Sequence, residues 1–242
     1  GDALTSGDGN VLIGHYAGSA LTTSYKNVYI GWESGKVTTA GAENVGIGDE
    51  TLKANTIGGV NTAVGHRAMR LNTQGFGNVA IGTDALYANT TGQRNTAIGG
   101  QDVLKSNTTG HLNIAIGYAA GDNITTGVGN VVIGRADVPS ATANRQLSIG
   151  AGDDDSTVWI TGESDGTVNF PASKIKLNGS YGSDGQVLTS TGSGAAWEDA
   201  GGGGSALNDL SDAFVAGTNL SIGNAGSGAY SGANNNVAVG PT

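Results

Sequence analysis

The sequence has no cysteine, only three prolines and few basic residues, and each shortage excludes a class of protein. Without cysteine, neither a disulfide framework nor a cysteine-ligated zinc site can form. A collagen helix needs much more proline and a glycine at every third position, which the 44 glycines here do not provide. The net charge of −9 leaves no basic footprint for nucleic acid. No run of about 20 apolar residues is present, so we expect no membrane insertion.

What the sequence has instead is one five-residue phrase, Asn-x-x-Ile/Val-Gly, which recurs eight times at near-constant spacing within residues 1–150. Examples are NVLIG at Asn10, NTAVG at Asn61 and NVAIG at Asn78. Successive asparagines lie 17 residues apart, apart from one step of 18. The full set is Asn10, Asn27, Asn44, Asn61, Asn78, Asn95, Asn113 and Asn130. A fixed period of this length predicts a solenoid, in which each repeat stacks on the next.

Within each phrase we count the asparagine as position zero, and positions one and three are then always β-branched. Position one is Val11, Val28, Val45, Thr62, Val79, Thr96, Ile114 and Val131. Position three is Ile13, Ile30, Ile47, Val64, Ile81, Ile98, Ile116 and Ile133. Residues two apart share one face of a strand, and β-branched residues suit a half-buried sheet. We therefore predict one short strand per phrase with these two columns in the inner core. The glycine at position four predicts a corner with positive φ or crowded backbones.

Stacking would turn each column into a ladder that runs along the solenoid. Asparagine side chains would join neighbouring coils through amide hydrogen bonds, while turn-rich segments such as ANTTG at Ala88 would form the loops. The predicted fold is all-β, a parallel β-solenoid or β-roll with 17-residue coils.

Self-association is expected because one thin coil buries few side chains against a large entropy cost. Position two, which this interpretation turns outward, is mostly apolar and would form a partner surface. Its members are Leu12, Tyr29, Gly46, Ala63, Ala80, Ala97, Ala115 and Val132. We expect a homotrimeric fibre with the solenoids intertwined or side by side.

Three regions follow from the change in pattern along the chain. Residues 1–150 form the repeat shaft, and residues 151–204 form a β-rich linker that ends in the glycine-rich joint GGGG. Residues 205–242 form a short helical or turn segment and the start of a further repeat unit. The chain begins in the second half of a repeat and ends within another, which suggests the hypothesis that both ends are cut from a longer protein.

Residues with the potential for chemistry are sparse, and surface positions explain them best. His15 and His66 share one position but lie three coils apart, about 14 Å, which is too far to share a metal. Several carboxylates follow the strands and could line a glycosidase-like groove, but they occupy variable positions. These carboxylates are Asp49, Glu50, Asp84 and Asp102. The run from Asp153 to Asp155 lacks the spacing of known calcium motifs, and whether it binds a cation stays open. We expect no catalytic, metal or cofactor site and no enzyme activity.

The repeated phrase resembles two known families. One is the head repeat of trimeric autotransporter adhesins, a parallel β-roll with VAIG-type strands. The other is a 17-residue variant common in bacteriophage tail fibres, and the spacing here favours it. GSYGSDGQVLTSTGSGAAWEDAG, from Gly179 to Gly201, resembles a linker of such fibres.

The resemblance implies a structural segment of a virion fibre, located on the virion, that forms a rigid trimeric shaft supporting host attachment. Its partners would be further copies of itself, other virion proteins and, as a candidate, a host cell-surface glycan. Two alternatives stay open: the head of a bacterial trimeric adhesin and a glycan-degrading tailspike.

Overall fold

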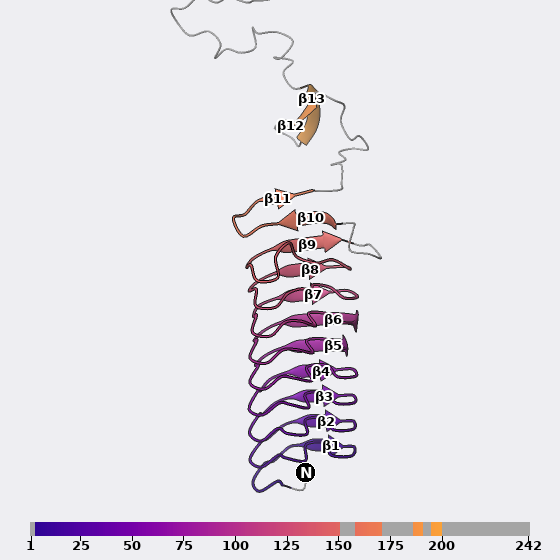
Figure 1. Cartoon of the computed structure of the whole chain (residues 1–242), viewed down its shortest axis with the longest axis vertical. Helices are drawn as coiled ribbons and strands as arrows, with labels where there is room; N and C mark the ends of the chain where they lie inside the picture. Colours follow the sequence, from indigo (N-terminus) through magenta and orange to yellow (C-terminus); the bar gives the residue numbers. More distant parts are fainter. Residues whose placement is uncertain (1–2, 151–157, 171–185, 191–194, 200–242) are drawn as a thin grey trace, which may run out of the picture. The chain divides into compact units, whose positions relative to one another are not determined.

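In the computed structural model, residues 3–150 form a stack of short strands joined by loops that return each coil to the same side (Figure 1). The structure describes residues 3–150, 158–170, 186–190 and 195–199. The chain divides into two compact units, Gly1–Ser173 and Lys174–Thr242. The predicted region 205–242 and its helix lie outside the described residues.

Strands make up all the regular secondary structure of the described residues, and no helix occurs among them. The first unit contains β1 (Val11–Ile13), β2 (Val28–Ile30), β3 (Val45–Ile47), β4 (Thr62–Val64), β5 (Val79–Thr83), β6 (Thr96–Gln101), β7 (Ile114–Ile116), β8 (Val131–Ile133), β9 (Leu147–Gly150), β10 (Val158–Gly162) and β11 (Val168–Asn169). In the second unit, β12 (Gln186–Ser190) pairs antiparallel with β13 (Ala195–Asp199).

Strands β1 to β9 pair in parallel, each with the next strand along the chain. The register places equivalent residues side by side, so that Ile13 lies beside Ile30 and Ile30 beside Ile47. The predicted fold class, a parallel β-solenoid with coils of about 17 residues, is therefore confirmed.

A ninth coil, which sequence reasoning missed, follows the eight predicted ones. It carries QLSIG, in which Gln146 takes the place of the ladder asparagine 16 residues after Asn130. After β9 the direction reverses: β10 runs antiparallel to β9, and β11 runs antiparallel to β10. The parallel stack thus changes to an antiparallel hairpin within the same sheet.

The predicted inner and outer faces of the strands are reversed in the structure. Position two is buried at Tyr29 and at the alanines of the middle coils, whereas position three is exposed by 58% at Ile13, 38% at Ile81 and 43% at Ile116. Alternation within a strand shows that two faces exist but cannot tell which is buried. The prediction placed the bulkier, β-branched face inside, and that was wrong.

The reason lies in the width of the coil. The core is filled by a second column, on the segment that returns beneath the strand, and its largest side chains are Leu52, Met69, Leu86 and Leu104. These side chains leave room only for small residues opposite them in most coils. Where a large residue occupies position two, as Tyr29 does, the residues that face it are glycines. A Cβ on Gly46 would lie 2.8 Å from Tyr29 Cδ1, and a Cβ on Gly35 would lie 2.5 Å from the same ring.

The repeat glycines at position four confirm the predicted corner. Gly48 has φ +134°, and a Cβ there would lie 2.5 Å from the carbonyl oxygen of Gly65 in the next coil. A second corner, one residue before the ladder asparagine, also needs positive φ, which is 67° at Gly77 and 56° at Val60. A β-branched residue such as Val60 is strained in that conformation.

Candidate functional site

The first polar feature of the stack is a continuous ladder of buried asparagine side chains. Asn78 Nδ2 donates to Asn61 Oδ1 at 3.1 Å and to the Gly92 carbonyl at 2.9 Å, while the Asn78 backbone N–H donates to the same Asn61 Oδ1 at 3.0 Å. From Asn27 to Asn130, every ladder asparagine donates its backbone N–H to the preceding side-chain oxygen. Gln146 continues the column by donating its backbone N–H to Asn130 Oδ1 at 2.8 Å. The ladder thus gives hydrogen-bond partners to buried amide groups, which would lower the stability of the fold if they were left unpaired.

A second asparagine ladder, which sequence reasoning missed, lies in the returning segment. It consists of Asn55, Asn72, Asn89 and Asn107, with side-chain bonds of 2.8 to 2.9 Å between successive members. The signal was the recurring Asn-Thr pair at steps of 17 and 18 residues, which was interpreted only as turn chemistry.

A third ladder is made by threonine hydroxyls next to these asparagines. Thr73 Oγ1 donates to the Thr90 carbonyl at 3.1 Å, and Thr90 Oγ1 donates to the Thr108 carbonyl at 3.1 Å. Backbone N–H groups of the same residues make parallel bonds, such as Thr73 N–H to the Thr90 carbonyl at 3.0 Å. Each coil is therefore tied to the next on several sides.

The second surface feature is the outer face of the sheet, formed by positions one and three of β1 to β8. We call it the Val/Ile face; its members are Val11, Ile13, Val28, Ile30, Val45, Ile47, Thr62, Val64, Val79, Ile81, Thr96, Ile98, Ile114, Ile116, Val131 and Ile133. Every member is half-buried or exposed, and none is charged. Trp32, Phe76 and Tyr118 are further exposed apolar side chains of the same unit.

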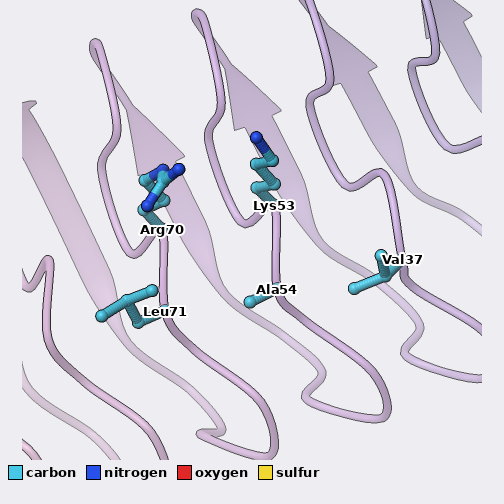
Figure 2. Close-up of a pocket in the computed structure, with 5 residues that line it drawn as sticks. All are labelled: Val37, Lys53, Ala54, Arg70 and Leu71. Carbon is cyan, nitrogen blue, oxygen red and sulfur yellow. The ribbon is translucent and has the colours of Figure 1, made fainter.

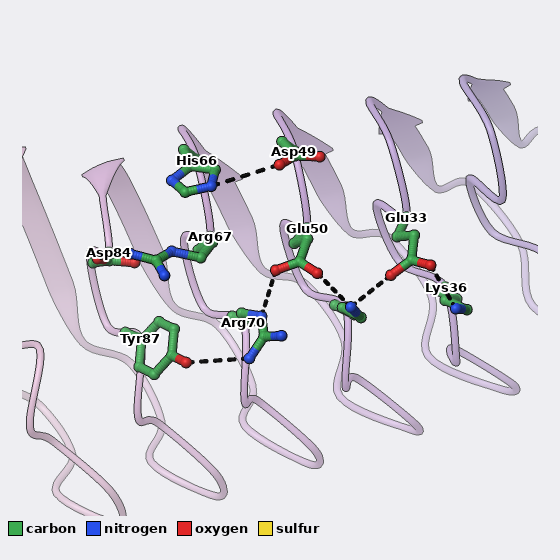
Figure 3. Close-up of polar contacts among 10 residues, drawn as sticks. Glu33, Lys36, Asp49, Glu50, His66, Arg67, Arg70, Asp84 and Tyr87 are labelled. Carbon is green, nitrogen blue, oxygen red and sulfur yellow. Dashed lines mark hydrogen bonds and ion pairs between the residues drawn. The ribbon is translucent and has the colours of Figure 1, made fainter.

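The third feature is a ridge of charged side chains along one side of the middle coils (Figure 3). Lys53 Nζ bridges Glu33 and Glu50 of successive coils. Arg70 Nε donates to Glu50 Oε2 at 2.7 Å, and Arg70 Nη1 donates to the Tyr87 hydroxyl at 3.1 Å. The ridge therefore links four successive coils by charge-assisted hydrogen bonds.

This environment stabilises the charged forms of the ridge. Hydrogen bonds from Lys36 and then from Lys53 lower the pKa of Glu33. Burial alone would raise the pKa of Glu50, but hydrogen bonds from Lys53 and Arg70 outweigh it and lower that pKa. The same bonds to Glu33 and Glu50 raise the pKa of Lys53. The ridge is thus an ion-pair network with both signs of charge satisfied.

The remaining carboxylates and histidines considered from the sequence occupy separate small contacts. Asp49 Oδ2 lies 3.5 Å from His66 Nε2, and Asp84 Oδ2 accepts from Arg67 Nη2 at 2.6 Å. Asp102 Oδ1 lies 2.8 Å from Lys105 Nζ. The His15 ring packs against Tyr16, with centroids 3.9 Å apart, and His111 is exposed. The structure pairs these groups along the stack and does not gather the carboxylates around one groove.

A shallow hollow of about 270 Å³ lies beside the ridge (Figure 2). Val37, Ala54 and Leu71 hold equivalent positions in three successive coils and form its apolar part, while Lys53 and Arg70 stand at its edge. Both cations already bind Glu50, so the hollow presents no unpaired charge of its own.

Comparison with known proteins finds no matching family model, no matching curated protein and no matching solved structure. Among the described residues, no three histidine or acidic side chains gather as a metal site would require, and no helix is long and apolar enough to cross a membrane. Asp153 to Asp155 lie outside the described residues, as does much of the linker from Gly179 to Gly201.

Proposed function

We propose that the chain is a structural, non-enzymatic segment of a bacteriophage virion fibre. It forms a rigid homotrimeric shaft that supports host attachment on the virion. Its partners are further copies of itself, other virion proteins and a host cell-surface glycan at or beyond the fibre tip.

The observation that carries this proposal is the unbroken set of axial ladders. Bending the stack would stretch the parallel strand pairing, the Asn10–Asn130 ladder and the threonine ladder together, and between Asn55 and Asn107 it would stretch the second asparagine ladder as well. Because the hydrogen bonds lie on several sides of the coil, no side is free to act as a hinge. At about 4.8 Å per coil, β1 to β9 span roughly 40 Å with one uniform construction, which suits a spacer.

The virion location is supported by the repeat itself. Its 17-residue period and its NTTG turns resemble tail-fibre repeats more closely than the shorter coils of adhesin heads. An adhesin head built on a similar β-roll is the second candidate, since its VAIG strands share the same phrase.

The test is immuno-electron microscopy with antibodies raised against the folded chain. Labelling of fibres on purified phage particles is the expected result, together with detection of the chain by mass spectrometry of those particles. Labelling confined to the surface of uninfected bacteria would contradict the proposal and favour the adhesin. Release of reducing ends from host polysaccharide by the purified chain would instead identify a tailspike.

A further inference from the structure

We infer that the Val/Ile face is an interface between copies of this chain, which associate laterally along the stack. The inference rests on the proposed homotrimeric shaft and names the surface through which its copies would associate. The sequence analysis predicted that surface at position two, which the structure shows to be buried in β2 to β8. The identity of the interface can be tested separately from the location of the assembly on a virion.

The face is a continuous apolar strip that no charged side chain interrupts. Its exposed members include Ile13 at 58%, Ile116 at 43% and Ile133 at 41%. Seven of the sixteen members are exposed by 38% or more and the other nine are half-buried, so the apolar side chains continue over all eight strands. A contiguous exposed apolar surface of this kind marks an interaction site.

The interior of the coil explains why the face needs a partner. The buried strand positions are mostly alanine, at Ala63, Ala80, Ala97 and Ala115, while the larger valines and isoleucines point outward. A monomeric solenoid would be expected to have polar residues on its outer strand face. This chain places most of its β-branched apolar surface where only another molecule can remove it from water.

The repeat period indicates that the partner is a second copy. Valine and isoleucine recur along the face at the strand spacing of about 4.8 Å over all eight strands. Another copy presents the same spacing over the same length, so the side chains of both can interdigitate at every level. A globular partner would match this pattern over only part of its length.

The margins of the face have the polar character of an interface rim. Lys26 and Glu43 form an ion pair at 3.6 Å and lie two residues before β2 and β3. Asp49 and His66 lie two residues after β3 and β4, at the other end of the strands. An apolar centre between charged margins is the usual anatomy of a protein interface.

The first experiment compares the mass of the full chain in sedimentation velocity with that of two triple variants. Wild type is expected to sediment as an oligomer, and Ile47→Lys/Ile81→Lys/Ile116→Lys as a folded species of 23.8 kDa. The matched control, Ile57→Lys/Gln74→Lys/Thr91→Lys, adds the same charge at exposed positions off the face and should stay oligomeric. A folded wild-type monomer at about 50 µM, or equal dissociation of both triples, would overturn the inference.

The second experiment does not depend on the stability of a dissociated chain. Because the native chain has no cysteine, Ile81→Cys introduces a single thiol at the centre of the face. Under mild oxidation, Ile81→Cys should form disulfide-linked dimers that Ile57→Cys does not form. Cross-linking through position 57 with none through position 81 would reject this face.

The two proposals fail separately. If Ile81→Cys cross-links but the chain is not found on phage particles, the virion-fibre proposal is refuted and the interface is supported. If the chain is found in fibres on phage particles but Ile81→Cys does not cross-link, only the proposed interface is refuted.

Discussion

Replacing one ladder asparagine with leucine tests the claim that amide stacking holds the coils together. Asn78→Leu keeps the number and branching of the side-chain heavy atoms but removes four hydrogen bonds, two to Asn61 Oδ1 and the Gly92 carbonyl and two from Asn95. Asn61 Oδ1 still accepts the backbone N–H of residue 78, and the Gly92 carbonyl still accepts from Asn89. The Asn95 backbone N–H is the buried donor that loses its partner.

The expected loss follows from these bonds. Each hydrogen bond contributes about 1 kcal/mol net, and a buried unpaired N–H costs about 2 kcal/mol more. Burial of the leucine side chain offsets about 2 kcal/mol, which leaves a loss of about 4 kcal/mol in the free energy of unfolding. For a chain of this size that corresponds to a melting temperature lower by roughly 10 °C.

The measurement is thermal unfolding followed by far-UV circular dichroism, with Gln93→Leu as the control at an exposed position. A second variant, Asn78→Asp, keeps the acceptor for Asn95 but loses both donors and buries a charge. Burial and the neighbouring carbonyl oxygens should raise the pKa of that aspartate above its unfolded value. In the pH range between those two values the folded state binds the extra proton, so stability falls as pH rises, and the deficit should be smaller at about pH 4 than at about pH 7. Melting of Asn78→Leu within about 1 °C of the control would refute the reasoning.

Three further predictions concern packing, charge and backbone strain. Gly46→Ala should lower the free energy of unfolding by about 1–3 kcal/mol, because the added Cβ would lie 2.8 Å from Tyr29 Cδ1 and 2.9 Å from Ser34 Oγ. Chemical denaturation should show a smaller effect of the same change in a Tyr29→Ala background, which removes the first of these clashes. Glu50→Gln should lower stability by roughly 2 kcal/mol at neutral pH. Because the folded-state pKa of Glu50 is lowered, its contribution is complete above the usual value of 4.5 and is lost as pH falls through the folded value, so the variant should show a shallower acid transition. Val60→Gly should leave the melting temperature unchanged or raise it, because relief of a positive φ, worth about 1–2 kcal/mol, offsets the added freedom of glycine in the unfolded chain; a loss as large as that of Val79→Gly within β5 would contradict this.

The reversed faces change the basis for expecting an assembly. The sequence argument placed an apolar stripe of small residues such as Ala80 on the outside, and this stripe is buried. The stripe that is exposed instead contains the larger residues, such as Ile81, so the expectation of self-association now depends on a surface of greater apolar area. The homotrimer stays a proposal, and the cross-linking experiment addresses the surface that would form it.

The sequence by itself determined the class of fold and the members of the Asn10–Asn130 ladder. Equal spacing of Asn10 through Asn130 required equivalent residues to stack, and the glycine at position four predicted a corner, which has a positive φ in every repeat but that of Gly99. These conclusions follow because period and φ are local properties, which the chain carries without reference to what surrounds it.

Only the tertiary structure decided which way each column points and which turn residues meet. The face of Ile81 depends on the volume left inside a coil by Leu86 and its neighbours, and no local pattern encodes that volume. The bond between Asn72 and Asn89 likewise depends on how the returning segment closes, although each residue alone reads as turn chemistry. The bridge of Lys53 between Glu33 and Glu50 arises only when successive coils bring variable positions into contact.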